Sequence, residues 1–236
     1  YVNGSSIAVL NMPFENNGTN DGTTDYSGYG NDGVPTGATW NATGGYDGKG
    51  AYHFDGIDDF INLPVVSYTL SWSFESWFKL DDTYDTSDIN DEMIYMSGGT
   101  NPDIYLYFGN TAGGRLAFRT YQPTENLLTT TNVWNAGEWY HVVITCEDNT
   151  IKKIYVNGLE ENSSSVACAH NGGIEGHLIG DYSAGGNALN GSIDEVKLFN
   201  RTLSSEQILA LYQNRTDLIV SQETNIGDNI SACVTP

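Results

Sequence analysis

The sequence predicts an all-β fold in which two antiparallel sheets pack face to face, as a sandwich or jelly roll. Short runs of alternating apolar and polar residues end repeatedly at Gly, Asn or Asp, and about a dozen of these runs are typical of strands. No series of helices alternates with them, and no repeat indicates a propeller or solenoid. A sandwich is therefore the simplest arrangement that buries one face of each strand.

The elements follow in order along the chain. We expect a strand at 6–14, a long polar loop at 18–33, strand pieces at 51–63 around an Asp-Gly turn, a strand at 68–80, an acidic loop at 81–92 and then a meander of short strands. Alternation in 68–80 places Leu70, Trp72, Phe74 and Phe78 on one face of that strand. Residues 138–148 and 151–161 are predicted to form a hairpin that turns at Asn149 and Thr150.

One short helix is predicted to follow the last strand. Ser204 suits the N-cap and Gln207 the third helical position, which together make a capping box. Leu203 and Ile208 lie where a hydrophobic staple would form. We expect one domain over 1–216, and then a linker and the first strand of a following β domain over 217–236; a last strand added to the main sheet is the alternative.

The charge balance excludes several partner classes. Acidic residues outnumber basic ones 30 to 9, for a formal charge of −21. Nucleic acid and anionic membrane surfaces need a basic face, so neither is expected as a partner. No apolar run reaches the 18 residues that a membrane span needs, so we expect no membrane insertion. Divalent cations and neutral sugars suit this charge.

The cysteines and sequons favour an extracellular or cell-surface protein. Cys146 and Cys168 flank part of the predicted hairpin and are expected to form a disulfide, with two buried thiols as the alternative. Cys233 is left without an assigned partner. No leader begins the sequence, so we expect that a secretion signal was removed or lies outside this sequence. Eight Asn-x-Ser/Thr sequons, about twice the number expected by chance, are candidate glycosylation sites: Asn3, Asn17, Asn41, Asn162, Asn190, Asn200, Asn214 and Asn229.

Four sequence patterns in a fixed order carry a family resemblance. They are AYHFDGIDDFINL, SFESWFKLDD, GEWYHVVITCED with IKKIYVNG, and GSIDEVKLFNRTLSSEQILALY. Together they resemble the laminin-G-like, concanavalin-A-like jelly rolls of secreted microbial multidomain proteins, over about residues 6–215. The resemblance implies a concanavalin-A-like lectin-glucanase sandwich with one short C-terminal helix. It does not imply one ligand, because this fold hosts lectins, adhesion modules, glycanases and spacers.

The same resemblance implies a structural calcium ion at the rim of the sandwich. Its ligands would come from the polar loop after the first strand and from the Asp of the last strand, which here are Asp25, Asn31 and Asp194. Calcium takes six to eight hard oxygen ligands, which these residue types supply. The alternative is an Asx-turn loop whose carboxylate accepts backbone N–H groups.

A catalytic pair of carboxylates is not expected. Asp194 and Glu195 are adjacent, so a regular strand would send them to opposite faces, whereas retaining glycanases need two carboxylates on one face. The four histidines show no zinc-binding spacing. Asp194 thus stays the calcium ligand that the family resemblance implies, and Glu195 is expected to be solvated or ion-paired.

Exposed aromatic side chains are the remaining candidates for a ligand site. Trp77 and Trp139 match positions that the family resemblance assigns to the sandwich interior. Tyr121 and Tyr182 have polar neighbours in sequence and are the candidate ligand-binding residues. Ordinary packing at the rim is the alternative for both.

These observations favour a non-catalytic extracellular module that binds glycan or a neighbouring surface protein and carries structural calcium. A building block of a cell-surface filament or array is the second hypothesis, since an exposed strand edge can accept a strand from another chain. A glycan-cleaving enzyme with an unfamiliar site is the third.

Overall fold

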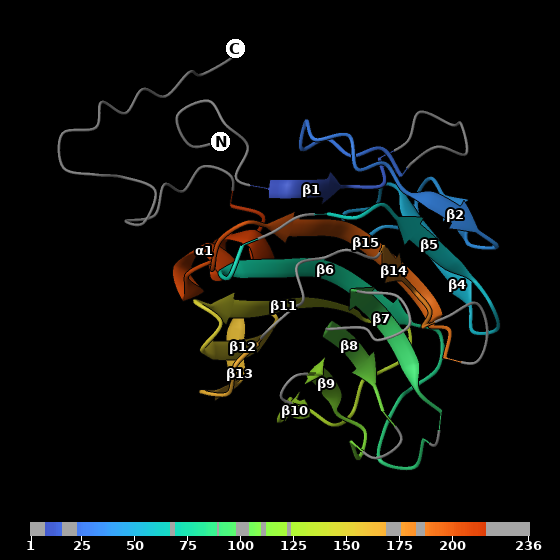
Figure 1. Ribbon diagram of the computed structural model, residues 1–236. Helices are drawn as coiled ribbons and strands as arrows, with labels where there is room; N and C mark the ends of the chain where they lie inside the picture. Colours follow the sequence, from blue (N-terminus) through green and yellow to red (C-terminus); the bar gives the residue numbers. More distant parts are fainter. Residues whose placement is uncertain are drawn as a thin grey trace.

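The structure is a sandwich of two antiparallel sheets, as the sequence predicts (Figure 1). It is a computed structural model that describes residues 8–15, 23–66, 69–88, 90–97, 104–109, 112–121, 124–168, 176–182 and 187–215. Cys233, the sequons at Asn3, Asn17 and Asn229, and the expected linker and strand at 217–236 lie outside the described residues. Within that described part, no helix is long and apolar enough to cross a membrane.

The larger sheet has eight strands. In spatial order they are β13 (Leu159–Ser164), β12 (Ile151–Val156), β11 (Trp139–Glu147), β6 (Trp72–Leu80), β15 (Asn190–Phe199), β4 (Ala51–Asp55) and β3 (Thr39–Asn41), while β1 (Ala8–Met12) also pairs with β15. Strand β15 is long enough to pair with β4 along its first half and with β1 along its second half.

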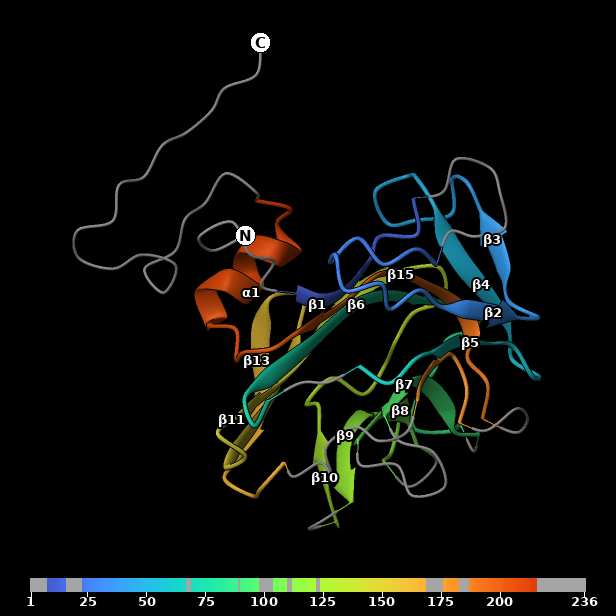
Figure 2. The same cartoon turned by 45° about the horizontal axis from the view of Figure 1, so that its top comes forward.

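The smaller sheet has seven strands. In spatial order they are β10 (Thr124–Leu128), β9 (Leu116–Tyr121), β8 (Ile104–Phe108), β7 (Glu92–Ser97), β14 (His177–Ile179), β5 (Phe60–Leu63) and β2 (Val34–Thr36). Figure 2 separates the two layers, with β7 to β10 in one and β6, β11 and β15 in the other.

The core between the sheets follows the alternation of the strands. On β6, Trp72, Phe74 and Phe78 point into it, as predicted. Leu70 does not, because the strand begins only at Trp72; Leu70 is 59% exposed.

The placement of Trp77 and Trp139 in the interior is wrong. Trp77 alternates with the core-facing residues of β6, so it lies on the outer face of that strand. There its ring is covered by Tyr46 and Tyr212, with 4.1 Å and 5.8 Å between ring centroids. Trp139 is half-buried beneath the ammonium of Lys79. Both faces of β6 are therefore buried, one by the opposite sheet and one by a loop and the helix.

The helix α1 (Ser205–Tyr212) begins as the sequence predicts. The Ser204 hydroxyl accepts from the Gln207 N–H, and the Gln207 side chain accepts from the Ser204 N–H. Leu203 and Ile208 are buried against side chains of β11, β12 and β15, so the helix caps the outer face of the larger sheet.

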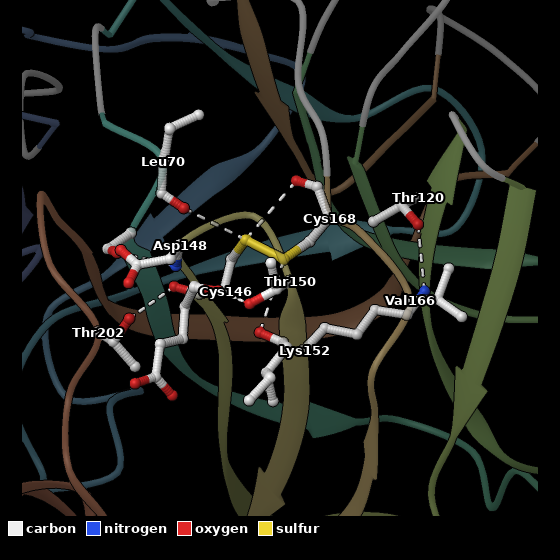
Figure 3. The surroundings of a disulfide bond; sticks show 12 residues. Leu70, Thr120, Cys146, Asp148, Thr150, Lys152, Val166, Cys168 and Thr202 are labelled. Carbon is white, nitrogen blue, oxygen red and sulfur yellow. Dashed lines mark hydrogen bonds between the residues drawn. A yellow bond between two sulfur atoms is a disulfide. The ribbon is translucent and has the colours of Figure 1, made fainter.

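The predicted disulfide is present between Cys146 of β11 and Cys168, which lies after β13 (Figure 3). It ties the end of the β12–β13 hairpin to β11 across a sequence separation of 22. Closing a loop of that length is worth about 3 kcal/mol of folding stability in the chain-entropy description. Beside it, the buried ammonium of Lys152 reaches the opposite sheet and bonds Thr120 Oγ1 at 3.1 Å.

Candidate functional site

The outer face of the seven-stranded sheet carries a row of side chains from successive strands. Register pairs Asn62 of β5 with Leu178 of β14, Leu178 with Met96 of β7, and Met96 with Tyr105 of β8. The row continues through Arg119 of β9 to Asn126 of β10. Directly paired residues share a face, so the row crosses the sheet at right angles to its strands. Its centre is apolar and aromatic, and both ends are amides.

Tyr105 is the centre of an aromatic cluster in this row. Its ring stacks on Tyr182 with 5.7 Å between centroids and 18° between planes. The Arg119 guanidinium carbon lies 5.6 Å from the same ring, and Tyr107 contacts its edge. These contacts fix the orientation of the tyrosines and of the guanidinium before any ligand arrives.

Arg119 retains unused hydrogen-bonding capacity. Its Nε is buried and donates to no acceptor among the residues that the structure describes. Burial raises the pKa of Tyr107, and the Arg119 charge partly opposes that shift. Tyr105 and Tyr107 are each only 8% exposed and lie in a buried cluster with Met93 and Met96. The half-buried Tyr182 ring and the half-buried Arg119 guanidinium are therefore the parts of this cluster left to contact a polyhydroxylated ligand.

Sequence analysis found one member of this cluster and missed the others. Tyr182, predicted as a ligand-binding residue, lies in it. Tyr121 ends β9, and its side chain lies outside the described part of the structure. The missed signal was IYLYF in β8, where Ile104, Leu106 and Phe108 face the core and the two intervening tyrosines face outward.

Asp25 and Asn31, two of the predicted calcium ligands, lie together on the outer edge of β1. Asp25 Oδ1 accepts from the Asn11 and Ser27 N–H groups, and Oδ2 accepts from the Ser27 hydroxyl and the Asn31 N–H, all at 2.7–2.9 Å. Asn31 Nδ2 donates to Val9 O. These are the hydrogen bonds of the Asx-turn alternative, and they close the free edge of β1 with the loop at 25–31.

Asp194, the third predicted ligand, lies against a different loop. Its Oδ2 accepts from the Tyr46 N–H and its Oδ1 from the Glu195 N–H. Burial, together with the nearby charge of Glu195, raises the pKa of Asp194 to about 8. Two hydrogen bonds do not offset the loss of water around this carboxylate.

The position beside Gly45 shows how oxygens converge around Asp194. A methyl group placed there would lie 2.6 Å from Asp194 Oδ2, 2.6 Å from Gly50 O and 3.1 Å from Lys49 O. Only a residue without a side chain fits this oxygen-lined space. A buried carboxylate and two carbonyl groups are ligands of the kind that calcium takes.

The adjacent pair Asp194 and Glu195 departs from strand alternation. Glu195 has a φ of 51° and lies at a register shift between β15 and β6, so an extra residue is accommodated there. The prediction that the two carboxylates face opposite sides is therefore wrong. The predicted ion pair of Glu195 is present, with Lys197 Nζ at 2.6 Å.

Lys197 also belongs to a buried group of charges beneath Trp77. Its ammonium lies 3.7 Å from Glu75 Oε1, which is 3.2 Å from His141 Nε2. Burial alone would raise the pKa of Glu75, but the charge of Lys197 and the hydrogen bond with His141 hold it below its usual value. Glu195 and Glu75 therefore both form ion pairs within the fold.

The acidic loop at 81–92 does not gather its carboxylates at one point. Asp81 pairs with His53, and Asp82 accepts from Asn190 Nδ2. Burial and the charges of Asp88, Asp82 and Asp81 raise the pKa of Glu92 to about 7. Among the described residues, a different trio in the β4–β5 turn brings carboxylate oxygens within 4.8 Å of one another, namely Asp55, Asp58 and Asp59.

The described sequons differ in how their amides are used. Asn41, Asn200 and Asn214 are exposed. Asn162 is exposed too, but its Nδ2 donates to Leu128 O across the sandwich edge. Asn190 is half-buried and donates to Asp82. A glycan attaches through Nδ2, so the last two amides are already engaged.

The chain matches one known protein family. Residues 54–209, more than half of the chain, match the Concanavalin A-like lectin/glucanases superfamily. The chain belongs to this superfamily. A search of curated protein sequences returned no match.

Solved structures of the superfamily fold include several binding domains. Domain 4 of AbnA, an extracellular arabinanase of Geobacillus stearothermophilus, solved with arabinotriose, has a TM-score of 0.69 at 20% identity and is covered completely by 89% of this chain. The binding domains of Paraclostridial Mosquitocidal Protein 1 and botulinum neurotoxin serotype D have TM-scores of 0.67 and 0.66 at 16% and 17% identity. This chain covers 52% of each toxin chain, with 88% and 89% of its own length aligned. At these identities the likeness shows the fold alone.

Proposed function

We propose that this chain is a non-catalytic extracellular module that binds a neutral glycan on the outer face of its seven-stranded sheet. The observation that carries the proposal is the end of the row, where the half-buried Tyr182 and Arg119 both contact the Tyr105 ring and the exposed Asn126 follows Arg119. A row that crosses several strands suits an extended ligand such as an oligosaccharide.

The charge and the relatives support the same ligand class. A formal charge of −21 disfavours acidic glycans and favours neutral ones. The AbnA domain was solved with arabinotriose, which motivates arabinose-containing and other neutral oligosaccharides as first probes. The disulfide and the exposed sequons support an extracellular or cell-surface location.

Calcium is part of the proposal as a structural ion. Asp194 would hold it together with backbone carbonyl groups of the loop at 44–50, since Asp194 Oδ2, Gly50 O and Lys49 O all approach the crowded backbone of Gly45. A divalent cation would neutralise the buried carboxylate and tie β15 to the loop at 44–50. Asp25 and Asn31 would contribute to the β1 edge instead, because their hydrogen bonds already fill that role.

Binding to neutral oligosaccharides tests the function directly. The unmodified chain is expected to bind at least one member of a neutral glycan array, and Arg119→Gln and Tyr182→Ala are each expected to weaken that binding about tenfold. Leu159→Ala, on an exposed position of the other sheet, is the matched control and should change nothing. No binding at millimolar ligand would refute the proposal.

The same preparations separate the alternatives. Release of reducing ends from array polysaccharides would indicate a glycan-cleaving enzyme. A particle larger than a monomer would indicate a filament or array component, for which strand addition at the β1 edge is disfavoured by the loop bound there.

A further inference from the structure

The loop at 23–33 presents two exposed tyrosines from an immobilised backbone. Burial alternates along its first half, with Thr23, Asp25 and Ser27 turned inward. Tyr26 is 53% exposed and Tyr29 is 62% exposed. Both side chains are thus more than half exposed.

The backbone beneath the tyrosines is held from several sides. The Tyr26 N–H donates to Asn11 O of β1, and the Tyr29 N–H donates to Ser27 Oγ. The Thr23 hydroxyl donates to Gly33 O, which closes the loop at its base. Together with the four hydrogen bonds to Asp25, these contacts fix where both rings emerge. Little ordering entropy would then be lost when a ligand binds.

The backbone on either side of Tyr29 carries no side chain. Gly28 and Gly30 flank Tyr29 with φ angles of 91° and 75°, and a side chain added at either would meet nothing within 4 Å. Positive φ favours glycine at these positions, and no side chain projects next to Tyr29 from either of them. The stretch 25–31 is also composed of Asp, Tyr, Ser, Gly and Asn, the residues that binding loops use for rigid aromatic contact and adaptable hydrogen bonding.

The chemistry of the loop selects one ligand class. No Lys or Arg occurs between 23 and 36, and the same loop carries the exposed Asp32, so an anionic ligand is disfavoured. Two tyrosines offer far less area than the roughly 800 Å² per partner of a stable protein interface. A sugar ring is small enough, since its apolar face stacks on an aromatic ring while hydroxyl groups bond phenol and carboxylate oxygens.

We propose that Tyr26 and Tyr29 form a second glycan-contact site, separate from the outer face of the seven-stranded sheet, which stacks neutral sugar residues. The chemical class of its ligand rests on the proposed function. The location of this site and the hydrogen-bonded loop that carries it do not depend on the proposed function.

The test compares four proteins on the same neutral oligosaccharides and on sulfated counterparts, by isothermal titration. Tyr26→Ala with Tyr29→Ala is expected to raise Kd about tenfold or more, while Tyr26→Phe with Tyr29→Phe keeps most of the affinity because the rings remain. Tyr182→Ala reports on the other site. Both loop positions are exposed, so unchanged thermal unfolding is expected for the loop variants.

The outcomes are distinguishable. Unchanged binding by the alanine variant, with weakened binding by Tyr182→Ala, overturns this proposal alone. If the double alanine variant binds more weakly and Tyr182→Ala does not, the loop site is supported and the outer-face site is refuted. Tighter binding of the sulfated ligands overturns the neutral assignment, and no binding by the unmodified chain overturns both proposals.

Discussion

Asp25 and Asp194 are both buried carboxylates beside strands of the larger sheet, yet the protein surrounds them differently. Asp25 accepts four hydrogen bonds from its own loop and from β1. Asp194 accepts two, and burial raises its pKa to about 8. One carboxylate is satisfied by the protein, whereas the other is costly to ionise unless a cation joins it. The number of donors around a buried carboxylate, more than its position in the sequence, therefore separates a structural residue from a candidate metal ligand.

The largest expected effect is the loss of stability when Asp25 is replaced. Asp25→Ala removes the acceptor of four donors, several of them buried, and should lower the free energy of unfolding by about 3 kcal/mol. Urea denaturation measures this loss. A loss below about 1 kcal/mol would mean that water replaces the carboxylate and that Asp25 does not hold the β1 edge.

Calcium is expected to bind at Asp194 and not at Asp25. At 100 times its Kd the ion is expected to stabilise the chain by about 2.7 kcal/mol, seen as a higher melting temperature than in chelator. Asp194→Asn should abolish that shift. Asp25→Asn is the matched control, which should lower stability but keep the calcium response; loss of the response there would restore Asp25 as a ligand.

Filling the space beside Gly45 should have a smaller effect. Gly45→Ala places a methyl group against three oxygens and should lower stability in chelator by about 1–2 kcal/mol. It should also weaken the calcium-dependent shift. Gly48→Ala is the control, since its φ of 82° is strained but its surroundings are open. Equal calcium responses in the two variants would argue against an ion in this space.

The pH dependence without metal is about 1.4 kcal/mol per pH unit at most for each group that titrates. The folded pKa of Asp194, about 8, exceeds its usual value of 3.8, so the unfolded chain releases this proton first and stability should fall as pH rises from about 4 to 8. Glu92 adds a fall in the same direction up to about pH 7. Chemical denaturation across this range should show a shallower fall for Asp194→Asn, and an unchanged slope would contradict the raised pKa.

Features governed by neighbours in sequence were predictable. The capping box at Ser204 and Gln207 depends on residues three apart, and the hairpin between β11 and β12 depends on Asp148 and Asn149, which accept the positive φ of its turn. The disulfide followed from a hairpin that brings its two ends together.

Features governed by strand register were not predictable. The extra residue at Glu195 reverses the expected direction of a carboxylate, because a bulge shifts every later side chain relative to simple alternation. The row through Tyr105, Arg119 and Asn126 joins three strands whose relative register no local pattern specifies.

By itself the sequence determined the strand-rich composition, the two-sheet fold, the capped helix and the covalent cross-link, since each rests on short-range periodicity, turn chemistry or a resemblance in local motifs. Only the tertiary structure decided that Trp77 lies on the outer face of β6, that Asp194 of β15 contacts the loop at 44–50 and not the loop that holds Asp25, and that tyrosines gather on one sheet face. Those facts depend on which strands pair, in which register, and on what covers each outer face, because side chains distant in sequence meet only through long-range packing.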